Sequence, residues 1–187
     1  MPDLLIEDEN FSGLTEQLQN AEYNNCSFRE CDFSESDLSE IVFSECHFDG
    51  CNLSLSRLNN TSFKDVTFTN CKLVGLRFSE CNDFLLEIKF EGCTLNLTSF
   101  YKLDLRDTSF IDCNLQEVDF SETDLQNAVF DNCDLQSAVF ERTNLQKANF
   151  YTAYNYRIDP EMNQIENARF SLAGIPGLLD KYNIKIR

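Results

Sequence analysis

The chain has 187 residues and a formal net charge of −17, with a sequence pI of about 4.3. This charge argues against direct binding to nucleic acid or to anionic lipid and favours a basic partner. No segment reaches the roughly 18 consecutive apolar residues of a membrane span, and the acidic start of the chain is unlike a secretory signal. Nine cysteines, an odd number, indicate free thiols in a reducing compartment. We therefore expect a cytoplasmic protein that does not contact a membrane.

A Phe or Leu occupies every fifth position from residue 28 to residue 78. The members of this first run are Phe28, Phe33, Leu38, Phe43, Phe48, Leu53, Leu58, Phe63, Phe68, Leu73 and Phe78. The spacing resumes, displaced by two residues, at Phe90, Leu95, Phe100, Leu105, Phe110, Leu115, Phe120, Leu125, Phe130, Leu135, Phe140, Leu145 and Phe150. We place this two-residue irregularity within residues 82–88. Both the bulky residue and the smaller residue two positions before it are predicted to point inward.

A period of five matches neither the 3.6 residues of an α-helix nor the alternation of a β-strand. The units that begin at Ala128, Cys133 and Ala138 resemble the A-(D/N)-L-x-x motif of pentapeptide-repeat proteins. This resemblance implies an all-β solenoid, a right-handed quadrilateral parallel β-helix in which four pentapeptides form one coil of about 20 residues. We expect a cap at residues 1–17, the β-helix at residues 18–170, and a short helical cap with a dimerisation segment at residues 171–187.

Coils of this length predict which residues stack on one another. One face should consist of Phe28, Phe48, Phe68, Phe90, Phe110, Phe130, Phe150 and Phe170. The next face should carry a cysteine ladder of Cys31, Cys51, Cys71, Cys93, Cys113 and Cys133. Neighbouring coils should lie about 4.8 Å apart and form parallel backbone hydrogen bonds.

The segment after residue 170 abandons the five-residue period. Pro176 is placed to start a short helix, and residues 183–187 alternate like a short strand. This tail resembles the C-terminal dimerisation module of gyrase-protecting members of the family, in which two rods join end to end. The residues assigned to dimerisation on this resemblance are Leu172, Ile175, Leu178, Leu179, Tyr182, Ile184 and Ile186.

The cysteine ladder could bind a metal ion, but an inward ladder does not offer the tetrahedral arrangement that zinc requires. We therefore interpret these cysteines as core residues. The single histidine, His47, should face solvent, and no general base is available to activate a cysteine or serine. Phosphate-binding loops are absent from the sequence. We predict no catalytic, cofactor-binding or metal site, and a protein that is not an enzyme.

Carboxylates are concentrated between Leu103 and Leu135, where Arg106 is the single basic residue. They are Asp104, Asp107, Asp112, Glu117, Asp119, Glu122, Asp124, Asp131 and Asp134. Averaged over a rod of about 38 Å, the net charge amounts to roughly one per 2.2 Å, close to the roughly one per 1.7 Å of duplex DNA. These residues form the predicted partner-binding surface. The alternative interpretation is an ordinary solvated outer face.

Residues 51–63, 71–75, 155–159 and 168–172 resemble albicidin-immunity proteins, within the branch that also holds the Qnr-type and MfpA-type proteins. The resemblance implies binding to DNA gyrase, topoisomerase IV or both, and protection against a quinolone or an albicidin-like toxin. Qnr-type proteins carry projecting loops, whereas this chain has only the excess within residues 82–88. The alternative is a non-catalytic scaffold or regulatory module with another partner, bound through this bulge, with Phe84 or Leu86 exposed.

Overall fold

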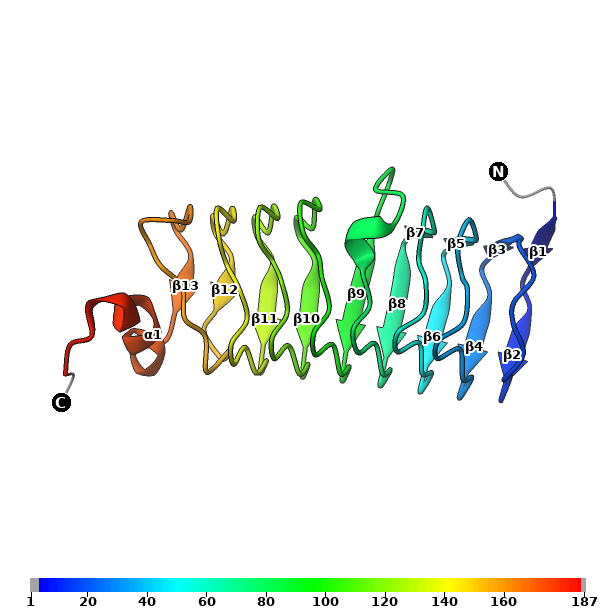
Figure 1. The fold of residues 1–187 in the computed structure, drawn as a ribbon, viewed down its shortest axis with the longest axis horizontal. Coiled ribbons are helices and arrows are strands. Elements are labelled where there is room, and N and C mark those ends of the chain that lie inside the picture. The colour runs from blue at the N-terminus through cyan, green and yellow to red at the C-terminus, as the bar shows by residue number, and fades with distance from the viewer. Residues whose placement is uncertain (1–3, 186–187) are drawn as a thin grey trace.

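The computed structural model describes residues 4–185, which form a straight rod of stacked coils (Figure 1). A four-stranded sheet consists of β1 (Leu5–Glu7), β3 (Glu22–Asn24), β5 (Val42–Ser44) and β7 (Ser62–Lys64). A nine-stranded sheet consists of β2 (Asn10–Ser12), β4 (Ser27–Arg29), β6 (His47–Asp49), β8 (Val66–Thr69), β9 (Ile88–Glu91), β10 (Ser109–Ile111), β11 (Val129–Asp131), β12 (Asn149–Phe150) and β13 (Arg169–Phe170). All neighbouring strands pair in parallel, so the predicted parallel β-solenoid is confirmed.

The rod has four faces, which we name A to D in the order in which each coil crosses them, starting from the nine-stranded sheet. Face A is the nine-stranded sheet, and face D begins with the four-stranded sheet. Single parallel bridges along face B join Asp32, Asn52, Lys72, Thr94, Asn114, Asp134 and Tyr154. Bridges along face C join Asp37 to Arg57, and Arg77 to Ser99, Asp119 and Val139. Face D continues at Asn82 and then at Asp104, Asp124, Asn144 and Gln164. The edges between faces are called AB, BC, CD and DA.

The edges arise because nearly every repeat contains one residue with a left-handed backbone. Glu30, Asn70 and Asp112 on the AB edge, for example, have φ values of 50°, 53° and 52°. One such residue in five turns the chain through a corner, and small polar residues tolerate this conformation better than apolar ones. The turn position therefore also decides which side chains project from the edges.

The aromatic residues form two stacks that run along the rod. The Phe rings of face A, from Phe28 to Phe170, lie 4.6 to 5.5 Å apart between centroids, as predicted. The second stack occupies face D as far as Phe63 and continues on face C from Phe78, and these two rings meet at a tilt of 56°. The second stack thus changes face in the coil that contains the irregularity.

Buried Cys, Ser and Thr side chains are satisfied by backbone carbonyl groups of the preceding coil. The Cys46 thiol donates to the carbonyl oxygen of Tyr23 at 3.3 Å, and the Thr61 hydroxyl donates to that of Leu38 at 2.8 Å. Donation of this kind requires a protonated thiol. Burial raises the pKa of Cys46 to about 12, which keeps the thiol protonated at neutral pH. These contacts support the interpretation of the cysteines as core residues.

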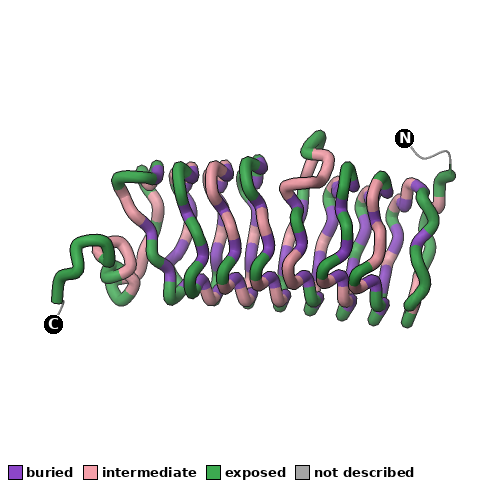
Figure 2. Tube along the Cα trace, in the orientation of Figure 1, coloured by how far each residue is buried: buried purple, intermediate pink, exposed green. Residues whose placement is uncertain are grey.

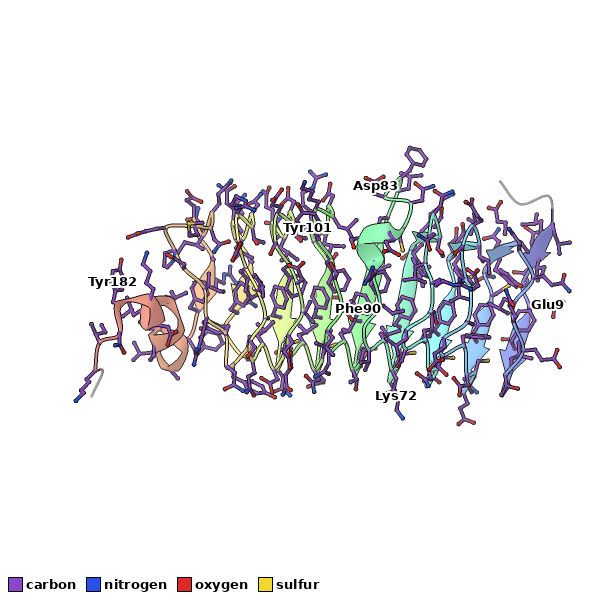
Figure 3. All side chains as sticks on the ribbon, viewed as in Figure 1. Glu9, Lys72, Asp83, Phe90, Tyr101 and Tyr182 are labelled. Carbon is purple, nitrogen blue, oxygen red and sulfur yellow. The ribbon has the colours of Figure 1, made fainter. Side chains whose placement is uncertain are left out.

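The irregularity projects from face D as a loop over residues 81–87, after the short 3-10 helix η1 (Phe78–Glu80) (Figures 2 and 3). Phe68 of β8 pairs with Phe90 of β9, a separation of 22 residues that confirms the two-residue excess. Phe84 and Leu85 are 66% and 64% exposed. Of the two residues named as alternatives for exposure, Phe84 is therefore the exposed one, whereas Leu86 packs against the core. It lies inside because Asp83, at the inward position in sequence, is displaced outward with the loop.

The N-terminal segment is more regular than its sequence indicates. Strands β1 and β2 lie within the residues assigned to a cap, and they pair with β3 and β4 in the ladders of the rod. Their register is Leu5 to Glu22 and Asn10 to Ser27, which is 17 residues instead of 20. A coil shortened by three residues escapes a search for a period of five, although Phe11 still stacks on Phe28.

The C-terminal segment forms three short helices on the end of the rod. These are η2 (Leu172–Gly174), α1 (Pro176–Leu179) and η3 (Asp180–Tyr182), and Pro176 begins α1 as predicted. The predicted strand after residue 182 was wrong for residues 183–185, because Asn183 is left-handed and no ladder follows it. Among residues 4–185, no helix is long and apolar enough to cross a membrane.

Candidate protein-binding surfaces

The nine carboxylates singled out in the sequence do not share one face of the rod. Three of them lie on face D or the CD edge and are compensated by basic residues. The Arg106 guanidinium donates to Asp104 at 2.8 Å and lies 4.0 Å from Asp124. Glu122 lies between Lys102 and Arg142, which come from the neighbouring coils. Apart from Asp104 with Arg106, these ion pairs join residues about 20 positions apart, so the sequence did not reveal them.

Four of the remaining carboxylates surround face B of the coils that contain β10 and β11. We call Asp112, Glu117, Asp131 and Asp134 the face B acidic patch; Asp107 and Asp119 lie on the DA edge and on face C. None of these six takes part in an ion pair among residues 4–185. Glu91 lies on the AB edge, one coil before the patch. It was not predicted, because the acidic segment singled out in the sequence begins at Leu103.

Neutral donors from neighbouring coils orient the carboxylates of the patch. The Asn132 amide donates to Asp112 at 2.6 Å, and the Thr152 hydroxyl donates to Asp131 at 2.6 Å. The Gln116 amide donates to Asp134 at 2.7 Å. Neutral donors hold a carboxylate in place without cancelling its charge. The face B acidic patch can therefore offer ordered, uncompensated negative charge to a basic partner.

The C-terminal module, residues 171–185, combines a buried contact with an exposed apolar surface. Leu178 packs against the core, whereas Leu172 is 90% exposed. The other predicted dimerisation residues divide similarly: Ile175, Tyr182 and Ile184 are exposed and Leu179 is half-buried, while Ile186 lies outside the described residues. The exposed members form an apolar end that a partner could cover.

Ion pairs fasten this module to the last coil. The Lys181 ammonium lies 2.7 Å from carboxylate oxygens of both Asp159 and Glu161. The Tyr182 hydroxyl donates to Glu161 at 2.9 Å. The hydrogen bonds from Lys181 hold the pKa of both carboxyl groups below their ordinary values.

We expect the module to loosen under acid. A carboxyl group whose pKa is lower in the folded state stabilises that state above its ordinary pKa of about 4, and this contribution disappears as the pH falls through the lowered value. The ring resonances of Tyr182 should therefore titrate below about pH 4. In a Lys181→Met variant the transition should move to higher pH, because the favourable charge is gone. Identical titrations in the two proteins would contradict this assignment.

A groove of about 630 Å³ lies between the projecting loop and the DA edge of the next coil. Its walls include Leu85, Lys89 and Arg106. Both basic side chains are already paired, Lys89 with Asp65 and Arg106 with Asp104. Within the described residues, no group of three or more His, Cys, Asp or Glu side chains could hold a metal ion.

Four faces built from five-residue units, with inward ladders and turns at fixed positions, define a β-solenoid of pentapeptide repeats. A family model for the pentapeptide repeat region matches residues 21–85 and 84–154. The chain belongs to the pentapeptide-repeat family. Proteins of this family are generally structural or interaction modules and not catalysts. A search among curated proteins found no match.

Solved structures share the fold at low sequence identity. HetL, a pentapeptide repeat protein involved in heterocyst differentiation regulation in the cyanobacterium Nostoc, superposes with a TM-score of 0.66 at 20% identity, over 89% of this chain and 87% of HetL. QnrB1, a plasmid-mediated fluoroquinolone resistance protein, superposes with a TM-score of 0.50 at 18% identity, over 98% of each chain. Identities this low establish the common fold only.

Proposed function

We propose that this protein is an acidic mimic of duplex DNA that binds DNA gyrase, topoisomerase IV or both. In this role it protects the enzyme from a poison such as a quinolone or an albicidin-like toxin. The face B acidic patch carries the proposal, because it presents uncompensated carboxylates on a straight rod. Basic residues of the enzyme that normally hold DNA phosphates would accept these carboxylates. Similarity of fold to QnrB1, itself a resistance protein, is compatible with this role.

We also propose that two rods join through their C-terminal modules. Leu172, Ile175, Tyr182 and Ile184 expose apolar side chains at this end of the rod. Burying them against a second copy would remove that surface from water. A dimer of this kind doubles the length of acidic rod available to a topoisomerase.

The test is DNA supercoiling by purified gyrase across a titration of this protein, with and without a fluoroquinolone or albicidin. Wild-type protein should restore supercoiling at low concentration or inhibit it in excess by competing with DNA. A variant with Asp112→Asn, Glu117→Gln, Asp131→Asn and Asp134→Asn should require at least about tenfold more protein, since charged contacts dominate such interfaces. Asparagine and glutamine retain the shape of each side chain, so the fold should persist.

The matched control removes the same charge from the coil that contains β5 and from β3 in the coil before it. It carries Glu22→Gln, Glu35→Gln, Glu40→Gln and Glu45→Gln, and it should behave like wild type. Binding should also weaken steeply with added salt, because the contacts are screened charges. Equal loss in the two variants would refute the assignment to the face B acidic patch, and a wild-type protein without any effect would refute the proposed function.

One observation favours a second candidate, a scaffold for another protein. The loop at residues 81–87 exposes Phe84 and Leu85 side by side, and aromatic side chains often anchor protein interfaces. The related fold of HetL, a regulatory protein, serves a different role from that of QnrB1. Capture of a partner by wild type but not by a Phe84→Ser variant, without any effect on gyrase, would favour this candidate.

A further inference from the structure

Charge is distributed unevenly along the rod. Residues 51–79 contain four basic residues, Arg57, Lys64, Lys72 and Arg77, and one acidic residue, Asp65. Their net charge of +3 contrasts with −20 for the remainder of a chain whose total is −17. Lys72 lies on face B, and Arg57 and Arg77 lie on face C. Three of the four basic residues therefore flank the BC edge.

The same edge exposes two leucines in left-handed conformations. Leu55 and Leu97 have φ values of 60° and 62° and are 59% and 58% exposed. Leucine is disfavoured at such a position, which asparagine or glycine occupies readily. Gly75 lies between them, and a Cβ atom there would approach the Leu55 side chain to 2.7 Å. The edge thus carries exposed apolar side chains on left-handed backbone. In a chain that does not associate, polar residues would be more stable at these positions.

The charges along the BC edge change from basic to acidic across the coil that contains Leu97. Lys72 and Arg77 lie one coil before it, and Glu117 and Asp119 lie one coil after it. Within residues 4–185, neither Lys72 nor Glu117 nor Asp119 forms an ion pair, and the exposed Arg77 pairs with Glu80 of its own coil at 3.2 Å. An inverted copy of this edge would oppose basic to acidic residues in both directions, whereas a parallel copy would oppose like charges.

We propose that the BC edge is a self-association surface on which a second copy of this chain lies antiparallel. A twofold axis passes beside Leu97, so that this side chain meets Leu97 of the second copy. Lys72 and Arg77 then face Glu117 and Asp119 of the second copy, and the reverse contacts follow by symmetry. Two coils from the axis, Leu55 and Arg57 face residues 134–139, where Val139 is also exposed. This contact does not involve the C-terminal module, and it shares Glu117 with the face B acidic patch, so a second copy and a topoisomerase would compete for that residue.

Disulfide cross-linking of exposed positions tests the geometry directly. Leu97→Cys should form a covalent dimer under mild oxidation by copper phenanthroline, because its two copies meet at the axis. Leu55→Cys is the matched control: it lies on the same edge with the same backbone conformation, but its two copies are about 19 Å apart, four coils at the usual spacing. It should not cross-link with itself, yet it should cross-link with Ser137→Cys in a mixture. Wild type controls for the nine native cysteines.

Charge reversal supplies a second measurement, by sedimentation velocity at increasing protein concentration. Arg77→Glu should weaken the side-by-side contact at least tenfold, and adding Asp119→Arg to the same chain should restore it. Lys64→Glu makes the same charge reversal in the same part of the rod but at the end of β7 on face D, away from the BC edge, so it should have no effect. Equal cross-linking of the Leu97→Cys and Leu55→Cys variants, no cross-linking of Leu97→Cys, or failure of the second substitution to restore association would overturn the proposal.

Discussion

Replacing Gly177 by alanine is expected to detach the C-terminal module from the end of the rod. A Cβ atom at this position would lie 2.2 Å from the backbone carbonyl oxygen of Tyr156 and 3.0 Å from its ring. Tyr156 cannot yield, because its buried ring packs against Phe150 and Phe170. Overpacking of this kind costs about 1–3 kcal/mol. The C-terminal module must move away, since the stacked rings of the rod hold Tyr156 in place.

Hydrogen exchange measured by mass spectrometry should show the change as lost protection over residues 171–182. The rod itself should exchange as before, because each coil is stabilised mainly by its neighbours. Ala173→Ser, in the exposed turn of η2, is the control and should preserve protection. If the proposed end-to-end dimer uses this module, Gly177→Ala should also yield monomers. Undisturbed exchange in Gly177→Ala would contradict the packing described here.

Replacing Phe110 by alanine should destabilise the whole rod by about 3–5 kcal/mol. The Phe110 ring stacks between Phe90 and Phe130, at 5.2 and 5.0 Å between centroids. It also contacts Phe100 and Phe120 edge to face. Truncation leaves a cavity in a closely packed column that cannot collapse without disturbing both ladders. Urea unfolding followed by circular dichroism should show a lower midpoint.

Phe84→Ala is the matched control for this experiment. It removes the same side chain from the projecting loop, where Phe84 is exposed, so the free energy of unfolding should change by no more than about 0.5 kcal/mol. A mid-rod cavity should also broaden the transition if the two halves of the solenoid begin to unfold separately. Similar midpoints for the two variants would mean that the stacked column contributes little to stability.

The fold was predictable because the five-residue period is a local property of the chain. Phe28, Phe48 and Phe68 recur at intervals that only stacking can explain, and their rings do stack. The shortened first coil was not predictable, since Leu5 and Asn10 are out of register with the period. The position of Leu86 was also hidden, because an insertion can place either of two neighbours against the core.

The candidate surfaces depended on contacts between coils. Sequence alone identified Asp112 and Glu122 as carboxylates, but only the coil geometry shows that Glu122 lies between Lys102 and Arg142 while Asp112 receives a neutral amide. Residues about 20 positions apart become neighbours, and their charges cancel or add accordingly. The sequence by itself therefore determined the repeat, the inward residues and the total charge. The tertiary structure decided which charges remain uncompensated, because ion pairing depends on distance in space and not along the chain.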